Sequence, residues 1–244
     1  KSIQGAIQQL VEDYKFNPYK ILEIVQQGIK SGFKKDYPEF KKSNIVVNIE
    51  NDGTVSIYRE LEVKEEDDEE YNEDIHIVIA EAKKIRKDIK DGEKLLINVT
   101  PKELELSRIA AQAAGQTIKQ GLKNLERERF YDKFQNKQGE LLKAQVVRVQ
   151  WESVILEIEW SPVVLSEQGQ IPNRIYEPGE EIFVFLKQIS KDSSWITLDI
   201  IQSTTDYIEA ILKKIVPEVD DGLVKIEKIA RMAWKKSKIV VSSS

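Results

Sequence analysis

The apolar residues near the N-terminus recur at helical spacing. Across residues 3–14 they follow alternating steps of three and one, which predicts an amphipathic helix with one buried stripe. Asn17 and Pro18 then have the pattern of an N-cap followed by a first-turn proline. They begin a second predicted helix that ends near the basic pair Lys34 and Lys35, where cations suit a helix C-terminus. The apolar side of this helix carries Ile21, Leu22, Val25, Ile29 and Phe33.

Strand patterns follow the two helices. Residues 44–63 alternate apolar and polar positions on both sides of residues 51–53, Asn-Asp-Gly, which predicts a hairpin with a tight turn. Residues 60–74 hold ten acidic side chains and one lysine, a pattern typical of a solvated loop or strand edge. Residues 74–89 and 94–100 predict a further strand, a short helix and another strand.

The longest helical pattern covers residues 101–137. Its apolar seam consists mostly of small side chains and should pack closely on the preceding domain. After Leu125 the seam lapses, and it resumes displaced at Phe130 and Phe134. We therefore expect one rigid connector helix, roughly 50 Å long at about 1.5 Å per residue, that leaves one domain and docks on another. The seam residues are Leu106, Ile109, Ala110, Ala113, Ala114, Thr117, Ile118, Gly121, Leu122 and Leu125.

From Gly139 to Ile201 the pattern changes to short strands. Five of them, ELLKAQVVRV, SVILEIEW, PVVLS, EEIFVFLKQI and SWITLDI, fit in about 60 residues without a helix, which is typical of a small barrel of OB type. DYIEAILKKIV then predicts a helix, and LVKIEKIA and KIVVSSS predict two strands.

One barrel strand offers a nucleic-acid platform. If its alternate residues Ile182, Val184 and Leu186 point inward, then Phe183, Phe185 and Lys187 point outward together. Two exposed rings beside a cation are what base stacking requires. The alternative is that the rings pack against a neighbouring domain.

Composition excludes several classes of function. The 244 residues are 41% hydrophobic and 32% charged with a net charge of -5, so the chain is globular and no general polyanion binder. Without cysteine there is no disulfide framework or thiolate metal site. The single histidine, His76, alternates with isoleucines and is expected at a surface or strand edge. No apolar run reaches the roughly 20 residues of a membrane span. We expect a cytoplasmic protein with no catalytic residues, no metal and no cofactor.

Several segments of the chain match one family. Residues 216–241, VPEVDDGLVKIEKIARMAWKKSKIVV, resemble the start of the first KH domain of the bacterial transcription elongation and termination factor family NusA. SRIAAQAAGQTI in the long helix is similar to that family's connector helix, and IPNRIYEPGEEI is similar to its barrel loop. The N-terminal FNPYKILEIV also fits. The resemblance covers essentially the whole chain in the right order.

The resemblance implies an α+β, multidomain fold. Residues 1–137 would be an α/β RNA-polymerase-binding domain with its connector helix at about 101–137. Residues 138–202 would be a five-stranded OB-type β-barrel of the RNA-binding kind, and residues 203–244 an incomplete first KH domain. The implied partners are the flap region of the polymerase beta subunit, nascent RNA and other antitermination factors, with no membrane. A monomer of this kind would modulate pausing, termination and antitermination without bond chemistry.

The family's contact residues carry over as follows. Lys34 and Lys35 match its basic pair, and Arg108 matches the helix arginine that approaches hairpin RNA. Gly115 stands where the family often has a lysine, which predicts a weaker contact. Glu159 replaces a family glycine and Gln202 an arginine, and both departures argue against sequence-independent RNA binding by this acidic barrel. For polymerase binding, the candidates are the apolar helical residues Leu22, Val25, Ile29 and Phe33, some of which must belong to the core, and the sequence does not say which.

Two other functions are consistent with parts of the sequence pattern. An RNA-binding module of a translation or RNA-decay factor would bind RNA but not polymerase. A hydrolase would use paired carboxylates such as Glu157 and Glu159, which are predicted to share one strand face. The chain begins at Lys1 and stops after a strand-like run, so we expect a fragment, with the Gly-x-x-Gly loop of the KH domain after Ser244.

Overall fold

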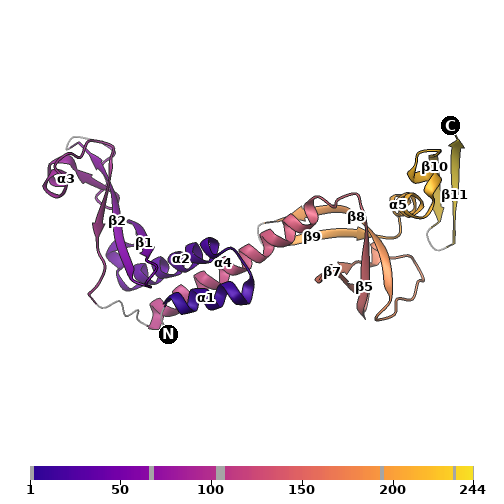
Figure 1. Cartoon of the computed structure of the whole chain (residues 1–244), viewed down its shortest axis with the longest axis horizontal. Coiled ribbons are helices and arrows are strands. Elements are labelled where there is room, and N and C mark those ends of the chain that lie inside the picture. Colours follow the sequence, from indigo (N-terminus) through magenta and orange to yellow (C-terminus); the bar gives the residue numbers. More distant parts are fainter. Residues whose placement is uncertain (1–2, 66–68, 103–107, 193–194, 233–234, 244) are drawn as a thin grey trace. The chain divides into compact units, whose positions relative to one another are not determined.

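The computed structural model describes residues 3–65, 69–102, 108–192, 195–232 and 235–243 (Figure 1). The chain divides into two compact units, Lys1–Leu125 and Glu126–Ser244. Both units combine helices and strands, so the expected α+β class is confirmed. Within the described ranges, no helix has both the length and the apolar character that crossing a bilayer requires.

The helices of the first unit follow the predicted pattern. They are α1 (Ile3–Tyr14), α2 (Pro18–Asp36) and the first part of α4 (Arg108–Gln135). The Asn17 side chain accepts a hydrogen bond of 2.9 Å from the Tyr19 backbone N–H, which confirms the predicted N-cap. The long helix was expected from residue 101, but residues 101 and 102 are not helical, and residues 103–107 lie outside the described residues.

The first unit also holds a four-stranded sheet built around one central strand. That strand, β2, pairs antiparallel with β1 and β4 and parallel with β3. The predicted hairpin at residues 51–53 joins the first pair of strands, and Gly53 adopts a φ of +89° there. The elements are η1 (Pro38–Phe40), β1 (Asn44–Ile49), β2 (Val55–Lys64), β3 (His76–Val78), α3 (Ile79–Ile85) and β4 (Lys94–Asn98).

Helix α4 packs on α2 through small residues, as the seam predicted. Ala110 and Ala114 are buried, and Leu122 joins the core that α2 forms with β1. A Cβ atom on Gly121 would lie only 2.9 Å from Cγ2 of Ile24, so the two backbones approach closely at this point. The core around α2 therefore depends on glycine at the crossing.

His76 corrects a prediction. It was expected at a surface or edge, but it is buried, with its Nδ1 accepting a 3.0 Å hydrogen bond from the Asn72 backbone N–H. The reason is a local turn. The backbone N–H groups of Ile75 and His76 both donate to the Asn72 carbonyl, and this turn brings the imidazole against the Asn72 N–H and leaves Ile75 exposed.

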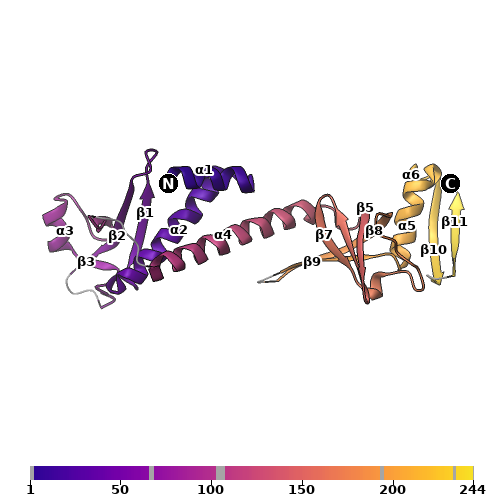
Figure 2. The same ribbon diagram turned by 90° about the horizontal axis from the view of Figure 1, so that it is seen from below.

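The second unit contains a near-closed, five-stranded antiparallel barrel. Its hydrogen-bonded order is β7-β6-β5-β8-β9, and contact between β7 and β9 brings the two edges together (Figure 2). Alternate residues of each strand fill one core, including Ile182, Val184 and Leu186 as predicted. This is the OB-type strand arrangement expected. The strands are β5 (Leu141–Gln150), β6 (Ser153–Ile158), β7 (Ser161–Leu165), β8 (Glu181–Lys191) and β9 (Ile196–Ile201), with η2 at Glu167–Gly169.

Strand β6 ends earlier than its sequence suggested. The apolar alternation ran to Trp160, but Glu159 and Trp160 have φ values of +48° and +66° and form a two-residue turn between paired Ile158 and Ser161. Two left-handed residues are the geometry of a type I′ hairpin turn, which tightens the connection to β7. Glu157 and Glu159 therefore do not share a strand face, contrary to the prediction.

The end of α4 belongs to the barrel. Phe134 is fully buried in the barrel core, and Phe130 packs against it, which confirms the displaced apolar face. Lys133 and Lys137 both pair with Glu159 in the β6–β7 turn. The helix is thus fastened to the barrel by an aromatic anchor and two ion pairs.

The C-terminal segment carries the predicted helix and strands. Tyr207 of the helix is buried, and the Arg231 guanidinium lies 5.3 Å from the centre of its ring. Its assignment to a KH domain stays a prediction, as do the bounds of the three domains. The elements are α5 (Thr205–Ile215), α6 (Pro217–Asp220), β10 (Val224–Met232) and β11 (Lys236–Ser243).

Candidate functional site

The basic pair at the C-terminus of α2 has two different environments. Lys35 is exposed, whereas Lys34 is half-buried and its ammonium donates to the Lys41 carbonyl at 3.3 Å. Burial, and then the nearby charge of Lys30, lower the pKa of Lys34 below its usual value. With Lys41 and Lys42 exposed close by, this end of α2 presents concentrated positive charge. Such a surface attracts phosphate groups without reading sequence.

The α4 face expected to extend this surface is open. Arg108 is the first described residue of α4, and its side chain lies outside the described part. Gly115 is exposed, and a Cβ atom there would meet nothing within 4 Å. The position can therefore hold a long side chain without disturbing the fold.

The barrel strand β8 partly meets the stacking prediction. Phe183 and Phe185 point away from the core as expected but are half-buried, and Lys187 is exposed. Lys214 of α5 lies 5.2 Å from the centre of the Phe183 ring, at a distance typical of a cation–π interaction. The two rings therefore share features of both interpretations. Helix α5 packs against Phe183, and both rings also remain partly accessible for stacking.

Three of the four polymerase-binding candidates are core residues. Val25, Ile29 and Phe33 are buried between α2 and the sheet, and Phe33 has no exposed surface. Their assignment as a docking surface is therefore wrong, because an amphipathic stripe marks a buried face without saying which element buries it. Leu22 is half-buried and packs at the edge of the same core.

A groove between α2 and α4 offers an accessible surface instead. It has a volume of about 860 Å³ and is lined by the half-buried Ile24 and Gly121 together with several amide side chains. Amide groups both donate and accept hydrogen bonds, so they can pair with the polar atoms of a docked segment. The lining residues are Glu23, Ile24, Gln26, Gln27, Gln116, Thr117, Gln120, Gly121 and Asn124.

One of the two carboxylates in the rival hydrolase hypothesis, Glu159, is poorly suited to act as a general acid. A hydrogen bond from Lys137, reinforced by the charges of Lys137 and Lys133, holds the pKa of Glu159 below its usual value. Glu159 is therefore ionised near neutral pH and cannot serve as a general acid. Within the described ranges, no group of three or more His, Asp or Glu side chains could hold a metal ion.

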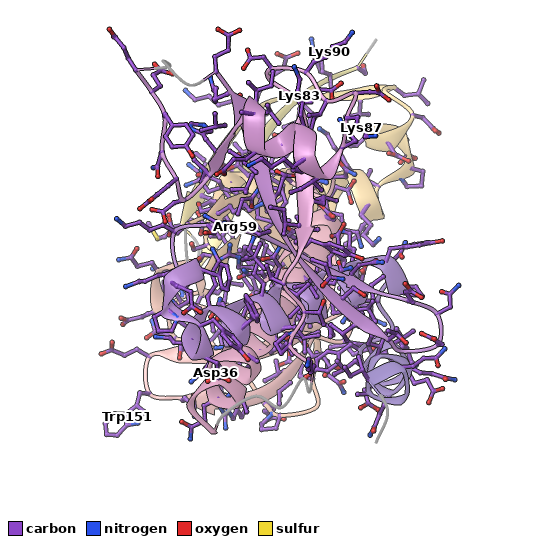
Figure 3. All side chains as sticks on the ribbon, turned by 90° about the vertical axis from the view of Figure 1, so that its left-hand side faces the viewer. Asp36, Arg59, Lys83, Lys87, Lys90 and Trp151 are labelled. Atoms are coloured by element: carbon purple, nitrogen blue, oxygen red, sulfur yellow. The ribbon has the colours of Figure 1, made fainter. Side chains whose placement is uncertain are left out.

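Sequence reasoning missed three features. Lys83, Lys87 and Lys90 gather over α3 as an exposed basic cluster (Figure 3), for which the run KKIRKDIK was the available signal. Trp151 and Trp160 stand in the tight turns of the barrel, fully or almost fully exposed. The third missed feature is the structural role of Gln202, whose side chain is fully buried and hydrogen-bonded.

Comparisons with known proteins agree on one family. The model of the NusA N-terminal domain matches residues 2–128. The transcription termination/antitermination protein NusA of Thermus thermophilus is 29% identical over 245 residues, which cover 98% of this chain and 63% of the relative. Its Bacillus subtilis counterpart is 26% identical over 221 residues, 91% of this chain and 58% of the relative. The chain thus spans about three fifths of these relatives' length.

A solved structure was also matched. The solution structure of the N-terminal domain of NusA from B. subtilis has 27% sequence identity and a TM-score of 0.37, and the match covers 51% of this chain and 95% of that one.

Proposed function

The chain belongs to the NusA family, and on that premise we propose that it is part of a non-enzymatic transcription elongation factor. It binds RNA polymerase near the RNA exit channel, contacts nascent RNA and modulates pausing, termination and antitermination. The observation that carries this proposal is the family match over residues 2–128. The relatives named transcription termination/antitermination protein support it over most of the chain.

The proposed work is binding rather than bond chemistry. A factor that holds a polymerase element and an RNA hairpin in one arrangement shifts their populations by its differential affinity for that state. Residues 1–137 supply the polymerase-binding part, residues 138–202 the OB-type barrel, and residues 203–244 an incomplete KH domain. The barrel's strand order supports the second assignment.

We place polymerase contact on the open sides of α2 and α4. Because Val25, Ile29 and Phe33 are buried, a partner reaches this part of the molecule only through half-buried or exposed residues. The groove is lined by Ile24 together with several amide side chains, so it offers a small apolar surface beside polar groups. An apolar centre with a polar rim is the usual anatomy of a protein interface.

RNA contact is proposed at the C-terminal end of α2 and on α4. Lys34 and Lys35 provide phosphate-attracting charge, and Arg108 extends it as the family resemblance implies. The half-buried Phe183 and Phe185, with Lys187, form a second and weaker contact on the barrel. These are phosphate and stacking contacts, so sequence selectivity is expected to be low.

The test is a pull-down at physiological salt in which the whole chain is the bait. The prey is the source organism's RNA polymerase core, prepared in two forms, with and without the helix at the tip of the beta-subunit flap. Binding that requires the flap tip is the expected result. Gln27→Arg with Gln120→Arg, which fills the groove, should weaken it, whereas Gln135→Arg at the exposed end of α4 should not. RNA binding without polymerase binding would instead favour a translation or decay module.

A further inference from the structure

The β5–β6 turn exposes a tryptophan at an energetic cost. Gln150 pairs with Ser153, so Trp151 and Glu152 form the two-residue turn between them. Trp151 has a φ of +46° and is completely exposed. A left-handed conformation is sterically unfavourable for a non-glycine residue, and an exposed indole gives up the stabilisation that burying its large apolar surface would provide. Glycine or asparagine would suit this turn better, so folding alone does not account for a tryptophan at this position.

A groove runs beside this tryptophan. It has a volume of about 730 Å³, and the turn forms one wall while the end of β7 and the η2 segment form the other. Val164 supplies a second apolar surface, because its side chain is half exposed. The lining residues are Gln150, Trp151, Glu152, Ser153, Val164, Ser166, Glu167 and Gln168.

The two walls are fastened to each other. The Gln170 side-chain amide donates to the Glu152 carbonyl at 2.9 Å and to the Leu165 carbonyl at 3.3 Å. Gly169 fixes the second wall from behind, since a Cβ atom there would lie 2.6 Å from the Ile200 carbonyl oxygen. The groove is thus preformed, so ligand binding carries little entropic cost for ordering its walls.

The negative charge of the groove favours a cationic ligand over an anionic one. Glu152 and Glu167 are exposed, one on each wall, and none of the lining residues is basic. The barrel region from residue 140 to 200 holds ten acidic and five basic side chains. A phosphate backbone would be repelled here, whereas a lysine or arginine could pair with either carboxylate and lie over the indole face.

We propose that this groove binds a protein partner through a short segment in which an apolar or aromatic residue is flanked by lysine or arginine. The apolar residue would rest between Trp151 and Val164, with the cations at Glu152 and Glu167. The site lies on the barrel alone, so it does not depend on polymerase binding by the first unit.

The test uses the whole chain labelled with nitrogen-15 tryptophan, whose indole N–H signals are assigned with Trp151→Phe and Trp160→Phe. Three probes are titrated: the peptide acetyl-KRLFRK-amide, its charge-reversed form acetyl-EDLFDE-amide, and a short oligouridylate. We expect the basic peptide to shift the Trp151 signal saturably and to leave Trp160 unchanged. Trp160 is the matched control because it is also an exposed tryptophan in a left-handed turn.

The groove variants sharpen this test. Glu152→Gln with Glu167→Gln should weaken the basic peptide about fivefold, and added salt should do the same. Gln170→Ala should also weaken it, although Gln170 does not line the groove, because its side chain joins the two walls. The proposal is overturned if the Trp151 signal ignores the basic peptide, or if the acidic peptide moves it equally. It is also overturned if oligouridylate alone moves it, because the groove would then be an RNA-stacking site.

Discussion

Gly28 of α2 lies so close to Ile118 of α4 that a Cβ atom on the glycine would be 2.5 Å from Ile118 Cγ1. The relationship is reciprocal, since Gly121 of α4 faces Ile24 of α2 in the same way. Each helix thus presents a glycine to the other's isoleucine. This fit sets the separation of the helices and, with it, the groove proposed for polymerase.

Gly28→Ala should therefore destabilise the first unit. Overpacking costs about 1–3 kcal/mol, and the new methyl would meet both Ile118 and the Ala114 carbonyl oxygen at 3.1 Å. Gly115→Ala is the matched control: it lies in the same helix pair but in open space, and should stabilise by about 0.5–1 kcal/mol. Urea unfolding followed by circular dichroism measures both. Equal stabilisation by the two changes would contradict the close approach.

Local patterns in the sequence predicted the helices and strands well. They did not predict which other elements each helix or strand packs against. The Asn17 cap, the small-residue seam of α4 and the inward residues of β8 follow from spacing alone. Spacing could not show that α2 buries its apolar stripe against β1, because that depends on a distant element. Nor could it place Trp160 in a turn, since glycine and asparagine are the residues that left-handed φ values favour.

Gln202 shows the same limit for a buried polar group. It replaces a family arginine, which suggested only a lost RNA contact, yet its side chain holds the barrel together. Its Oε1 accepts from the Tyr176 hydroxyl at 2.7 Å, and its Nε2 donates to the Phe183 carbonyl at 2.5 Å. Only the packed barrel brings these three residues together.

Gln202→Leu should destabilise the barrel by about 2–3 kcal/mol. The change keeps a similar volume but leaves the Tyr176 hydroxyl and the Phe183 carbonyl without their buried partner. Thermal unfolding of the whole chain measures the effect. The control is Gln188→Leu on the exposed side of β8, for which a change within about 0.5 kcal/mol is expected. Similar effects of the two substitutions would show that the hydrogen bonds contribute nothing.

The joint between α4 and the barrel should weaken in acid. Lys137 and Lys133 lower the pKa of Glu159 in the folded state, so its stabilising contribution is present above the unfolded value of about 4.5 and lost as pH falls through the folded value. Because Glu159 is partly exposed, the contribution is at most about 1 kcal/mol.

Glu159→Gln should destabilise the folded state by that amount at neutral pH and have no effect in acid. Urea unfolding across this pH range measures it, with Glu177→Gln, at an exposed position, as the control. A difference between wild type and Glu159→Gln that persists in acid would contradict the ion pairs.

Gly115→Lys should strengthen RNA binding by the first unit. The position is open, lies in the helix that begins at Arg108, and stands where the family often has a lysine, so the new cation extends the proposed phosphate-binding surface. Each added phosphate contact increases the slope of log affinity against log salt by about 0.7–0.9. A titration of a labelled RNA hairpin at several salt concentrations should therefore show a steeper slope for Gly115→Lys and a shallower one for Lys35→Ala.

Lys35 is the better deletion, because the Lys34 ammonium already bonds to the Lys41 carbonyl and its loss would also disturb the fold. Gly115→Ala separates charge from helix stabilisation, since it should raise stability and leave the salt slope unchanged. An unaltered slope for both lysine variants would place RNA contact elsewhere on the chain.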